Sequence, residues 1–554
     1  MDPKPAAQPA TDPTVTPTAP TAPDAPGQPG PTQSKSAAPK ATTAAKKPPA
    51  AKAKPMSASM LPLKPSQFGY EQARHLLWRA GFGGTPTQIN TLVKWGLNKS
   101  VDQLLNYESI PFDEPRADLF DHDIMRPTSD EEKGELARAR KAGDETLVAR
   151  FRAQRQEAQR LDREQMTKIQ HWWLKRMVET PRPLEEKMAL FWHGHFATSY
   201  RTIEDSYHMY MQNRLFRRFA VGSYAKLLYE IIRDPAMIAY LNNNESRKGK
   251  PNENLAREIM ELFSLGVGNY TEKDIKEGAR ALTGYTFDDD TFVFNRKNHD
   301  TGTKSILGAM GPLDGDGFVT AILQQPACSE FMCTKLYKFF VADLPTGSKD
   351  MDQAAHAVCQ SLSAEFSLGN YEIKPVLRKL FLSEHFYQPR VMGERIKSPT
   401  ELVVGTIRSL DTPARDLGML TTAMNMMGQN IFYPPSVKGW DGGRAWINTA
   451  TMFVRQNIAC FLLTGRTPSG FDALAKVESY DPSAVLRELR QGQMGDADNR
   501  EVVDALLRFA LGRTRAHNRD LLLEFVGQRG GNVSAETLIQ ALLLVTAMPE
   551  YQLC

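Results

Sequence analysis

Apolar residues recur at intervals of three and four along most of the chain from about residue 68 onward, which is the spacing of an amphipathic helix. The first such segment, Tyr70–Arg79, ends at the glycine-rich turn over 81–84. Thr85 and Pro86 then follow in the order preferred for a helix N-cap and a first helical residue, which predicts a second helix. Further helices are predicted over 501–511, 519–526 and 535–548.

A charged segment precedes the apolar middle of the chain. Residues 130–165 are almost entirely charged and alanine-rich, with opposite charges three and four positions apart. This pattern predicts one long solvated helix or a pair of helices. The predicted helix becomes apolar and aromatic at 171–174 and ends near 180–183. A new helix is predicted over 184–191.

Two sequence signatures mark further helix starts. Ser398 and Glu401, with a proline between them, form a capping box. Thr271 and Asp274 form a related start for a helix that ends near 283–284.

Strand signals are scarce and lie in one region. Alternating residues over 285–287 and 291–294 surround the acidic turn 288–290, which predicts a β-hairpin. The whole pattern predicts a mainly α protein, a large multi-helix globular domain with a small β-hairpin excursion near 285–310.

Composition separates an N-terminal arm from the rest of the chain. The first 60 residues hold 14 of the 36 prolines and contain no Leu, Ile, Phe, Tyr or Trp. Because such a segment buries too little apolar surface to offset its ordering entropy, we expect a disordered Pro/Ala/Lys-rich arm over 1–62. Residues 63–554 are expected to form a single large helical domain with a charged helical insert near 130–165.

Charge and targeting signals narrow the function classes. The seven lysines and three aspartates of the first 60 residues account for the whole net charge of +4, so the neutral remainder argues against nucleic-acid binding. No apolar signal region follows Met1, and no stretch approaches the roughly 18–20 apolar residues of a membrane span. The sequence as given therefore predicts a cytoplasmic protein without a transmembrane segment, whereas a misassigned start would make it periplasmic or part of the cell envelope. Five cysteines, an odd and sparse number, imply no disulfide framework.

Four polar clusters contain the candidate chemistry, and the first is FWHGHF at 191–196. His193 and His195 flank a glycine, and on an extended backbone both imidazoles would point to one side, as metal ligation requires. In the alternative, both histidines are interior or capping residues whose polar atoms bind backbone groups.

The second cluster is NENLAREIMELF at 252–263, which places Glu258 and Glu261 on one face of a helix. Paired carboxylates in this position can chelate a hard cation or share a proton. In the alternative, Arg257 pairs with a glutamate four positions away and the glutamates support neighbouring loops. Asn254 is a candidate substrate-binding residue in the same run.

The third cluster pairs His299 with Asp300 in a loop just after the hairpin, an arrangement suited to acid/base chemistry or ligand binding. The alternative is structural, with Asp300 capping the turn and His299 packing on the hairpin.

The fourth cluster, over 433–449, is rich in glycine and tryptophan. Trp440 and Trp446 offer flat stacking faces, while Lys438 and Arg444 supply donors for an anion. This mixture suits a sugar or an acidic small molecule, and the alternative is a rigid core loop in which Arg444 binds backbone carbonyls. The chain contains no Walker-type phosphate loop, G-x-S-x-G, H-E-x-x-H or dinucleotide fingerprint.

Five motifs in this order resemble the bacterial family catalogued as domain of unknown function 1800. The resemblance covers roughly 68–550 and omits the arm. The motifs are RHLLWRAGFG at 74–83, FWHGHF at 191–196, NENLAREIMELF at 252–263, ARALTGY at 279–285 and KGWDGGRAWIN at 438–448.

The resemblance implies partners and a location rather than a reaction. Members of the family are often exported, and their genes often lie beside those of a phosphatase- or sulfatase-like family of unknown function 1501. It therefore implies a protein of that second family as a candidate partner. Polysaccharide is a further candidate partner if the protein is a binding or assembly factor, and the neutral charge argues against nucleic acid. Phe263 stands where many relatives have histidine, which weakens a metal site in this chain.

We expect the first three clusters to converge on one polar pocket. The fourth cluster, which we call the tryptophan–glycine loop (433–449), would form its wall. The hypothesis is a metal- or acid/base-dependent enzyme acting on a carbohydrate or anionic substrate, and the alternative is a non-catalytic cell-envelope binding or assembly factor. Whether the protein is an enzyme stays open at this point. The catalytic candidates are His193, His195, His299 and Asp300; the candidate ligands of a divalent metal ion are Glu258, Glu261, His193 and His195; the substrate-binding candidates are Asn254, Lys438, Trp440, Arg444 and Trp446.

Overall fold

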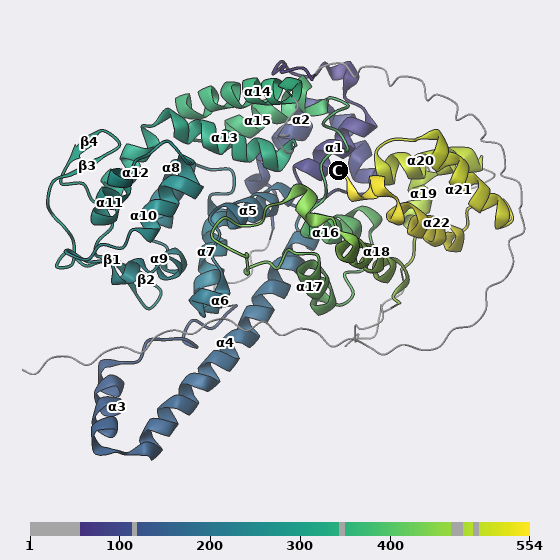
Figure 1. The fold of residues 1–554 in the computed structure, drawn as a ribbon. Coiled ribbons are helices and arrows are strands. Elements are labelled where there is room, and N and C mark those ends of the chain that lie inside the picture. The colour runs from purple at the N-terminus through teal and green to yellow at the C-terminus, as the bar shows by residue number, and fades with distance from the viewer. Residues whose placement is uncertain (1–55, 113–118, 343–348, 467–479, 491–497) are drawn as a thin grey trace, which may run out of the picture. The chain divides into compact units, whose positions relative to one another are not determined.

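The computed structural model describes residues 56–112, 119–342, 349–466, 480–490 and 498–554 (Figure 1). In these residues, 22 α-helices accompany two small antiparallel sheets of two strands each, which confirms the mainly α prediction. None of the described helices combines the length and the apolarity that a bilayer crossing requires. All five cysteines are free thiols, and four of them are buried.

Helices make up most of the described chain, and the four strands lie together in one part of the sequence. In chain order, the α-helices and strands are α1 (Tyr70–Arg79), α2 (Pro86–Leu105), α3 (Asp130–Ala142), α4 (Glu145–Glu179), α5 (Pro183–His195), α6 (Tyr200–Ile203), α7 (Ser206–Arg218), α8 (Tyr224–Ile231), α9 (Pro235–Tyr240), α10 (Asn254–Glu258), α11 (Glu272–Ala281), β1 (Tyr285–Asp288), β2 (Thr291–Phe294), β3 (Lys304–Ile306), β4 (Ala309–Gly311), α12 (Gly315–Leu323), α13 (Pro326–Phe340), α14 (Lys349–Leu368), α15 (Ile373–Leu382), α16 (Pro399–Leu410), α17 (Leu417–Met426), α18 (Thr449–Thr464), α19 (Ser483–Leu489), α20 (Asn499–Leu511), α21 (Ala516–Gln528) and α22 (Ala535–Ala547). A π-helical turn, Ile259–Ser264, continues directly from α10.

The predicted helix starts are present with their capping hydrogen bonds. The Ser398 hydroxyl accepts from the backbone N–H of Glu401 at 3.2 Å, and the Glu401 carboxylate accepts from the backbone N–H of Ser398 at 2.8 Å. Thr271 caps α11 and Thr85 caps α2 in the same way. These side chains satisfy N–H groups that lack a partner within the helix, which is why the local sequence predicts the boundaries.

The charged segment forms a helix pair, one of the two arrangements that its sequence predicted. Gly143 adopts a left-handed conformation between α3 and α4. In Figure 1, α3 lies beside the outer half of α4, away from the other helices. The inner half of α4 changes character because Met166, Ile169 and Trp173 are fully buried in the core.

The predicted hairpin is confirmed, with β1 and β2 in antiparallel register from Tyr285 opposite Phe294 to Asp288 opposite Thr291. The Tyr285 ring packs on both Phe292 and Phe294, with centroids 5.3 Å and 5.2 Å apart. A second hairpin, β3–β4, completes the β excursion.

The predicted arm over 1–62 lies outside the described residues as far as residue 55. Residues 56–62 are described and contact distant parts of the chain. The Ser59 hydroxyl donates to the Glu384 carboxylate at 2.8 Å, Pro62 pairs with Ser383 as an isolated bridge, and Met56 is buried.

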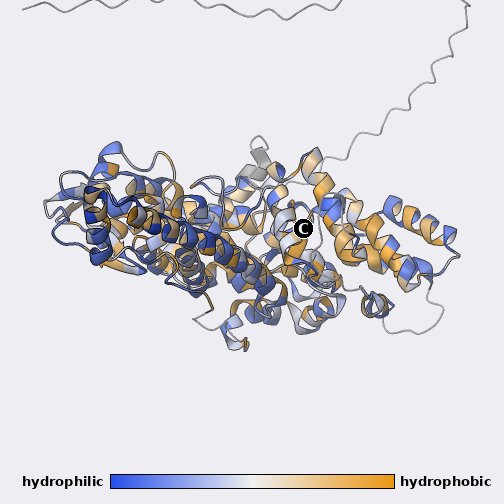
Figure 2. Ribbon diagram, turned by 90° about the horizontal axis from the view of Figure 1, so that it is seen from below, coloured by the Kyte–Doolittle hydropathy of each residue, from blue (hydrophilic) through white to orange (hydrophobic). Residues whose placement is uncertain are grey.

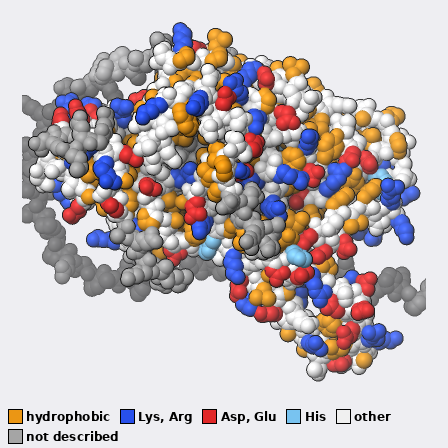
Figure 3. All heavy atoms as spheres, turned by 180° about the vertical axis from the view of Figure 1, so that it is seen from behind, with side chains coloured by type: hydrophobic (Ala, Val, Ile, Leu, Met, Phe, Trp, Pro, Cys, Tyr) orange, Lys and Arg blue, Asp and Glu red, His pale blue; other side chains and the backbone are white. Residues whose placement is uncertain are grey.

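Hydrophilic and hydrophobic residues alternate along individual helices in Figure 2, as expected for amphipathic helices around a common core. Figure 3 shows Lys and Arg side chains interspersed with Asp and Glu side chains on the face in view. This distribution fits the neutral charge of the chain beyond its first 60 residues.

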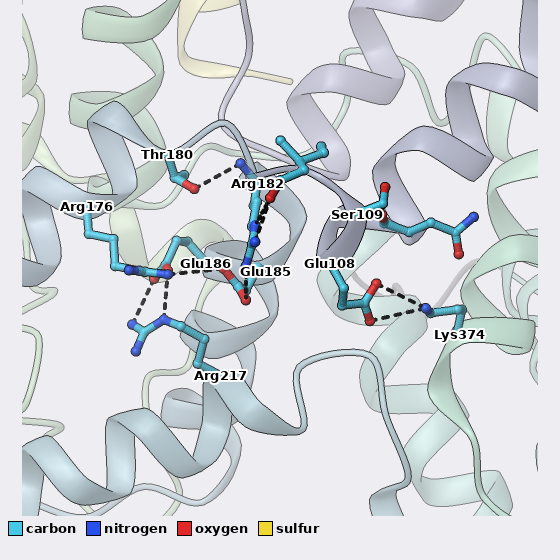
Figure 4. A network of polar contacts seen from close by, with 11 residues as sticks. Glu108, Ser109, Arg176, Thr180, Arg182, Glu185, Glu186, Arg217 and Lys374 are labelled. Carbon is cyan, nitrogen blue, oxygen red and sulfur yellow. Dashed lines mark hydrogen bonds and ion pairs between the residues drawn. The ribbon is translucent and has the colours of Figure 1, made fainter. Parts of the chain in front are cut away.

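The core also holds buried charges, and Glu186 of α5 is central to one group (Figure 4). Its carboxylate is fully buried and accepts from Arg217 at 2.8 Å and 3.0 Å, from Arg176, and from the Trp173 indole N–H at 2.8 Å. The neighbouring Glu185 pairs with Arg176 at 3.2 Å. This network joins α4, α5 and α7.

A second buried ion pair joins Lys187 of α5 to Glu401 of α16. Lys187 also donates to the Gly81 carbonyl at 2.8 Å, and its ammonium lies 5.0 Å from the centre of the Phe82 ring. Arg395 donates to the same Glu401 carboxylate at 2.6 Å. Near its start, α5 is therefore held to α4 and α7 through Glu186 and to α16 through Lys187.

Candidate functional site

A pocket of about 370 Å³ lies where the end of α5 meets α13 and the tryptophan–glycine loop. We call it the lysine–tryptophan pocket. It unites two of the four sequence clusters with residues from α13 and from the loop before α16. Its lining consists of Leu190, Phe191, Gly194, His195, Lys335, Lys338, Phe339, Arg395, Ser398, Gln429, Lys438, Trp440, Asp441, Gly442, Gly443 and Trp446.

The tryptophan–glycine loop is docked onto α5 through a close backbone contact. Gly439 has a φ of +81°, and a Cβ at this position would lie 2.2 Å from the carbonyl oxygen of Gly194. The adjacent Trp440 ring packs edge-to-face on His193, with centroids 5.5 Å apart. The missing side chain of Gly439 therefore lets the loop approach the Gly194 carbonyl closely enough to form the pocket wall.

His193 holds the loop that leads to this wall. Its Nε2 accepts from the backbone N–H of Phe432 at 2.9 Å, so the neutral ring carries its proton on Nδ1. The ring is buried among aromatic side chains, and burial lowers its pKa to about 3. His193 thus matches the structural alternative, a histidine satisfied by a backbone group.

His195 lines the pocket and has the opposite tautomer. Its Nε2–H donates to the carbonyl of Phe263 at 2.9 Å, while its Nδ1 is buried and has no partner among the described residues. Burial, followed by the charge of Lys335, lowers its pKa to about 3. His195 therefore offers an acceptor nitrogen rather than a positive charge.

The helical backbone separates these two histidines. Because α5 continues through His195, residues 193 and 195 lie about 160° apart around the helix axis and not on one side. The extended backbone that joint metal ligation requires is not formed. Phe263 fills the space beside His195, with ring centroids 5.8 Å apart.

The pocket is rich in positive charge. Lys335 and Lys338 lie one turn apart on α13, and Arg395 and Lys438 bring the number of lining cations to four. Arg395 is already paired with the buried Glu401 carboxylate at 2.6 Å. Burial lowers the pKa of Lys335, and the charges of Lys338 and Lys438 lower it further. Lys438 is exposed and pairs with Asp441 at 2.8 Å. An anion placed here would relieve the repulsion between like charges.

The two glutamates of the second cluster lie near each other but away from this pocket. Burial and the charge of Glu261 raise the pKa of Glu258. Tyr270 donates its hydroxyl proton to Glu261 at 2.5 Å. Arg257 pairs with Glu253 at 3.2 Å and with Glu272 at 2.9 Å. Within the described residues, no hydrogen bond or ion pair joins either predicted metal-binding glutamate to His193 or His195.

His299 and Asp300 are placed as in their structural alternative. The His299 Nδ1–H donates to the Thr283 carbonyl at 2.8 Å, and its ring packs edge-to-face on Phe294 with centroids 5.0 Å apart. Asp300 binds Arg280 at 2.8 Å, accepts from the backbone N–H of Gly302 at 2.9 Å, and has its pKa lowered to about 2, first by Arg280. The predicted convergence of all the clusters on one pocket is therefore not seen in the described part of the chain.

The predicted substrate-binding residues divide into two groups. Lys438, Trp440 and Trp446 line the lysine–tryptophan pocket. Arg444 and Asn254 are exposed, and neither is among the described residues that line this pocket.

Sequence reasoning missed Lys335, Lys338 and Arg395. The two lysines lie at i and i+3 on an amphipathic helix, a spacing that also occurs on any solvated face. Nothing in the local sequence distinguishes them from surface residues.

A different group could hold a metal ion. In the described part of the chain, the ligand atoms of His122, Asp289 and Asp290 lie within 4.8 Å of one another. This group contains none of the four residues predicted as metal ligands. Its only sequence signal was the acidic turn at 288–290.

The neutral histidines predict a pH dependence of stability. Because folding lowers the pKa of His193 and His195 from 6.5 to about 3, the unfolded chain takes up protons that the folded chain rejects as the pH falls below 6.5. Their contribution is therefore present above pH 6.5 and is lost progressively toward pH 3. Each histidine should reduce the free energy of unfolding by about 2 kcal/mol between pH 6.5 and 5.

Urea unfolding at several pH values between 5 and 7 measures the slope of the free energy of unfolding against pH. His193→Gln keeps an acceptor for the Phe432 N–H but does not titrate. The slope of this variant should therefore correspond to the uptake of about one proton fewer on unfolding. An unchanged slope in this variant would contradict the assignment of a neutral buried His193.

The comparison with protein families gives one match. The model described as "Protein of unknown function (DUF1800)" matches residues 75–553, which include the lysine–tryptophan pocket. No curated protein and no solved structure matches the chain.

Proposed function

The chain belongs to the family of proteins of unknown function DUF1800, and for this member we propose that it binds an anionic carbohydrate in the lysine–tryptophan pocket. The observation that carries the proposal is that four cationic side chains and several aromatic rings line the same pocket. Cations select carboxylate or sulfate groups, and aromatic faces pack against the C–H faces of sugar rings.

The shape and chemistry of the pocket support a small ligand. Its volume of about 370 Å³ lies within the common range for small-molecule sites, about 300–1,000 Å³. Four rings, those of Phe191, Phe339, Trp440 and Trp446, provide apolar surface. His195 also lines the pocket, and it is neutral because burial lowers its pKa to about 3.

The charge of the pocket should make it selective for acidic over neutral sugars. Lys335 is half-buried and repelled by two neighbouring lysines, so a bound carboxylate would restore its pKa toward the ordinary value. At a pH where Lys335 is partly deprotonated, binding of an acidic sugar should consequently take up protons. The affinity should fall as the salt concentration rises. A neutral sugar of the same size gains neither contribution.

The test is a titration of the full chain with uronic-acid and sulfated oligosaccharides, each paired with a neutral oligosaccharide of equal length. Tryptophan fluorescence and calorimetry report binding, because two tryptophans line the pocket. An acidic ligand should bind at least tenfold more tightly than its neutral counterpart. Lys335→Met should lower that affinity at least fivefold and leave the fold intact.

Lys94→Met is the matched control, since Lys94 is an exposed helical lysine on α2, outside the pocket lining. It should bind as the wild type does. The proposal fails if no acidic oligosaccharide binds, if neutral ones bind equally well, or if Lys335→Met leaves the affinity unchanged.

A further inference from the structure

His122, Asp289 and Asp290 bring three metal-type ligands together from two segments of the chain. His122 lies in the connection before α3, while the two aspartates form the tip of the β1–β2 hairpin. His122 Nδ1 is 3.9 Å from Asp290 Oδ2, and all three ligand atoms lie within 4.8 Å of one another. One imidazole nitrogen and two carboxylate oxygens form a donor set typical of first-row divalent metals such as Mn²⁺ and Zn²⁺.

A fourth residue fixes the orientation of these ligands. His208 of α7 is only 5% exposed, and its Nε2 lies 3.1 Å from the Asp289 carbonyl and 3.2 Å from Asp290 Oδ1. Asp290 therefore uses one carboxylate oxygen to contact His208 and turns the other toward His122. Outer residues that orient a ligating carboxylate in this way are a regular part of metal sites.

The hairpin tip also borders a large cavity. Asp290 lines a space of about 670 Å³ whose other charged lining residues are Arg214, Arg217, Arg218, Arg233, Glu185, Glu230 and Asp234. Three of these arginines already pair with carboxylates, Arg217 with Glu186, Arg218 with Glu230 and Arg233 with Asp316, so Arg214 is the arginine best placed to bind an added anion. Arginines are suited to bidentate binding of phosphate-type oxyanions, and a divalent cation commonly shares such an anion with them. Asp290 therefore connects the three metal-type ligands with the cavity.

We propose that His122, Asp289 and Asp290 bind a divalent first-row metal ion at the edge of the arginine-lined cavity, and that this ion and the arginines together bind a phosphate-type oxyanion. The metal site is distinct from the lysine–tryptophan pocket, because the linings share no residue among those described. Three protein ligands leave coordination positions open for water or the oxyanion.

The first experiment measures Mn²⁺ binding to metal-free full chain by electron paramagnetic resonance, with Zn²⁺ as a competitor. The wild type should bind one Mn²⁺, which Zn²⁺ displaces. His122→Ala and Asp289→Asn should each weaken Mn²⁺ binding at least tenfold. Both variants should fold, because the His122 side chain is 57% exposed and asparagine tolerates the left-handed φ of +50° at position 289.

Asp441→Asn removes an exposed carboxylate elsewhere and should bind Mn²⁺ as the wild type does. Loss of binding in this control, absence of Mn²⁺ and Zn²⁺ binding in the wild type, or wild-type affinity in Asp289→Asn would each overturn the metal site.

The second experiment titrates inorganic phosphate by calorimetry with and without saturating Mn²⁺. Phosphate should bind at least tenfold more tightly when Mn²⁺ is present. Arg214→Met should reduce phosphate affinity at least fivefold without changing Mn²⁺ affinity, because Arg214 is exposed in the cavity and is not one of the three ligands. If neither the presence of Mn²⁺ nor Arg214→Met changes the affinity for phosphate, the oxyanion part of the proposal is overturned.

Discussion

Replacing Glu186 with glutamine is expected to lower the free energy of unfolding by about 3–5 kcal/mol. The substitution keeps the volume of the side chain but removes a charge that is paired with both Arg176 and Arg217. It also turns amide N–H donors toward guanidinium donors. The destabilisation arises because two largely buried cations lose a shared counter-charge that the little water around them replaces only in part.

Equilibrium unfolding in guanidinium chloride at pH 7 measures the effect. Glu157→Gln is the matched control, since Glu157 pairs with Arg160 at 2.5 Å on the exposed part of α4. Exposed pairs contribute about 0–1 kcal/mol, so this variant should remain close to the wild type. Equal losses in the two variants would show that burial is not what gives Glu186 its importance.

Glu185 provides a second readout of the same variant. Burial raises the pKa of Glu185 to about 7, and the negative charge of Glu186 contributes to that rise. Removing the Glu186 charge should therefore lower the pKa of Glu185. Its carboxylate would then ionise more fully beside Arg176, which recovers part of the lost stability.

The helices were predictable because their signals are local. Ser398 and Glu401 contact each other three residues apart, so the sequence alone contains both partners of the capping box. The β1–β2 hairpin was predictable for the same reason, with Tyr285 and Phe294 separated by a short acidic turn. In each case the stabilising contact spans a few positions.

The pocket was only partly predictable because its members come from distant positions. Trp440 and Trp446 could be proposed from one glycine-rich loop, yet Lys335 belongs to a helix about 100 positions earlier. The role of His193 depends on the backbone N–H of Phe432, 239 positions away. Neither the tautomer nor the burial of that histidine leaves a trace in the residues beside it.

The metal-type cluster shows the same limit. The acidic turn at 288–290 was visible as a turn, whereas its imidazole partner, His122, lies in an irregular segment far from it in sequence. Conversely, Glu258 and Glu261 are close in sequence and in space, but no histidine joins them among the described residues. Sequence proximity therefore singled out Glu258 and Glu261, whereas the cluster of His122, Asp289 and Asp290 depends on a contact between distant segments.

Replacing Gly439 with alanine is expected to cost roughly 3 kcal/mol or more of stability and to weaken the lysine–tryptophan pocket. The left-handed φ of +81° contributes about 1–2 kcal/mol of strain for a residue with a Cβ. The new Cβ would also lie 2.2 Å from the Gly194 carbonyl oxygen, so the loop must move away from α5. Overpacking of this kind adds about 1–3 kcal/mol.

Two glycine variants separate these causes. Gly249 has a φ of +82° with no atom within 4 Å of its added Cβ, so Gly249→Ala should show the conformational strain alone. Gly194 lies on the other side of the contact, within α5, and its added Cβ would be 3.8 Å from the Trp440 ring. Gly194→Ala should therefore be neutral or slightly stabilising, because alanine favours a helix more than glycine does.

The decisive comparison is between stability and ligand binding. If the loop moves, Trp440 leaves its position against His193 and the pocket loses an aromatic wall, so the affinity for an acidic oligosaccharide should fall more than tenfold in Gly439→Ala. Gly249→Ala should lose stability without losing affinity. If Gly439→Ala unfolds no more easily than Gly249→Ala, the close backbone contact between the two family motifs does not hold the loop in place, and the wall of the pocket depends on other contacts of Trp440.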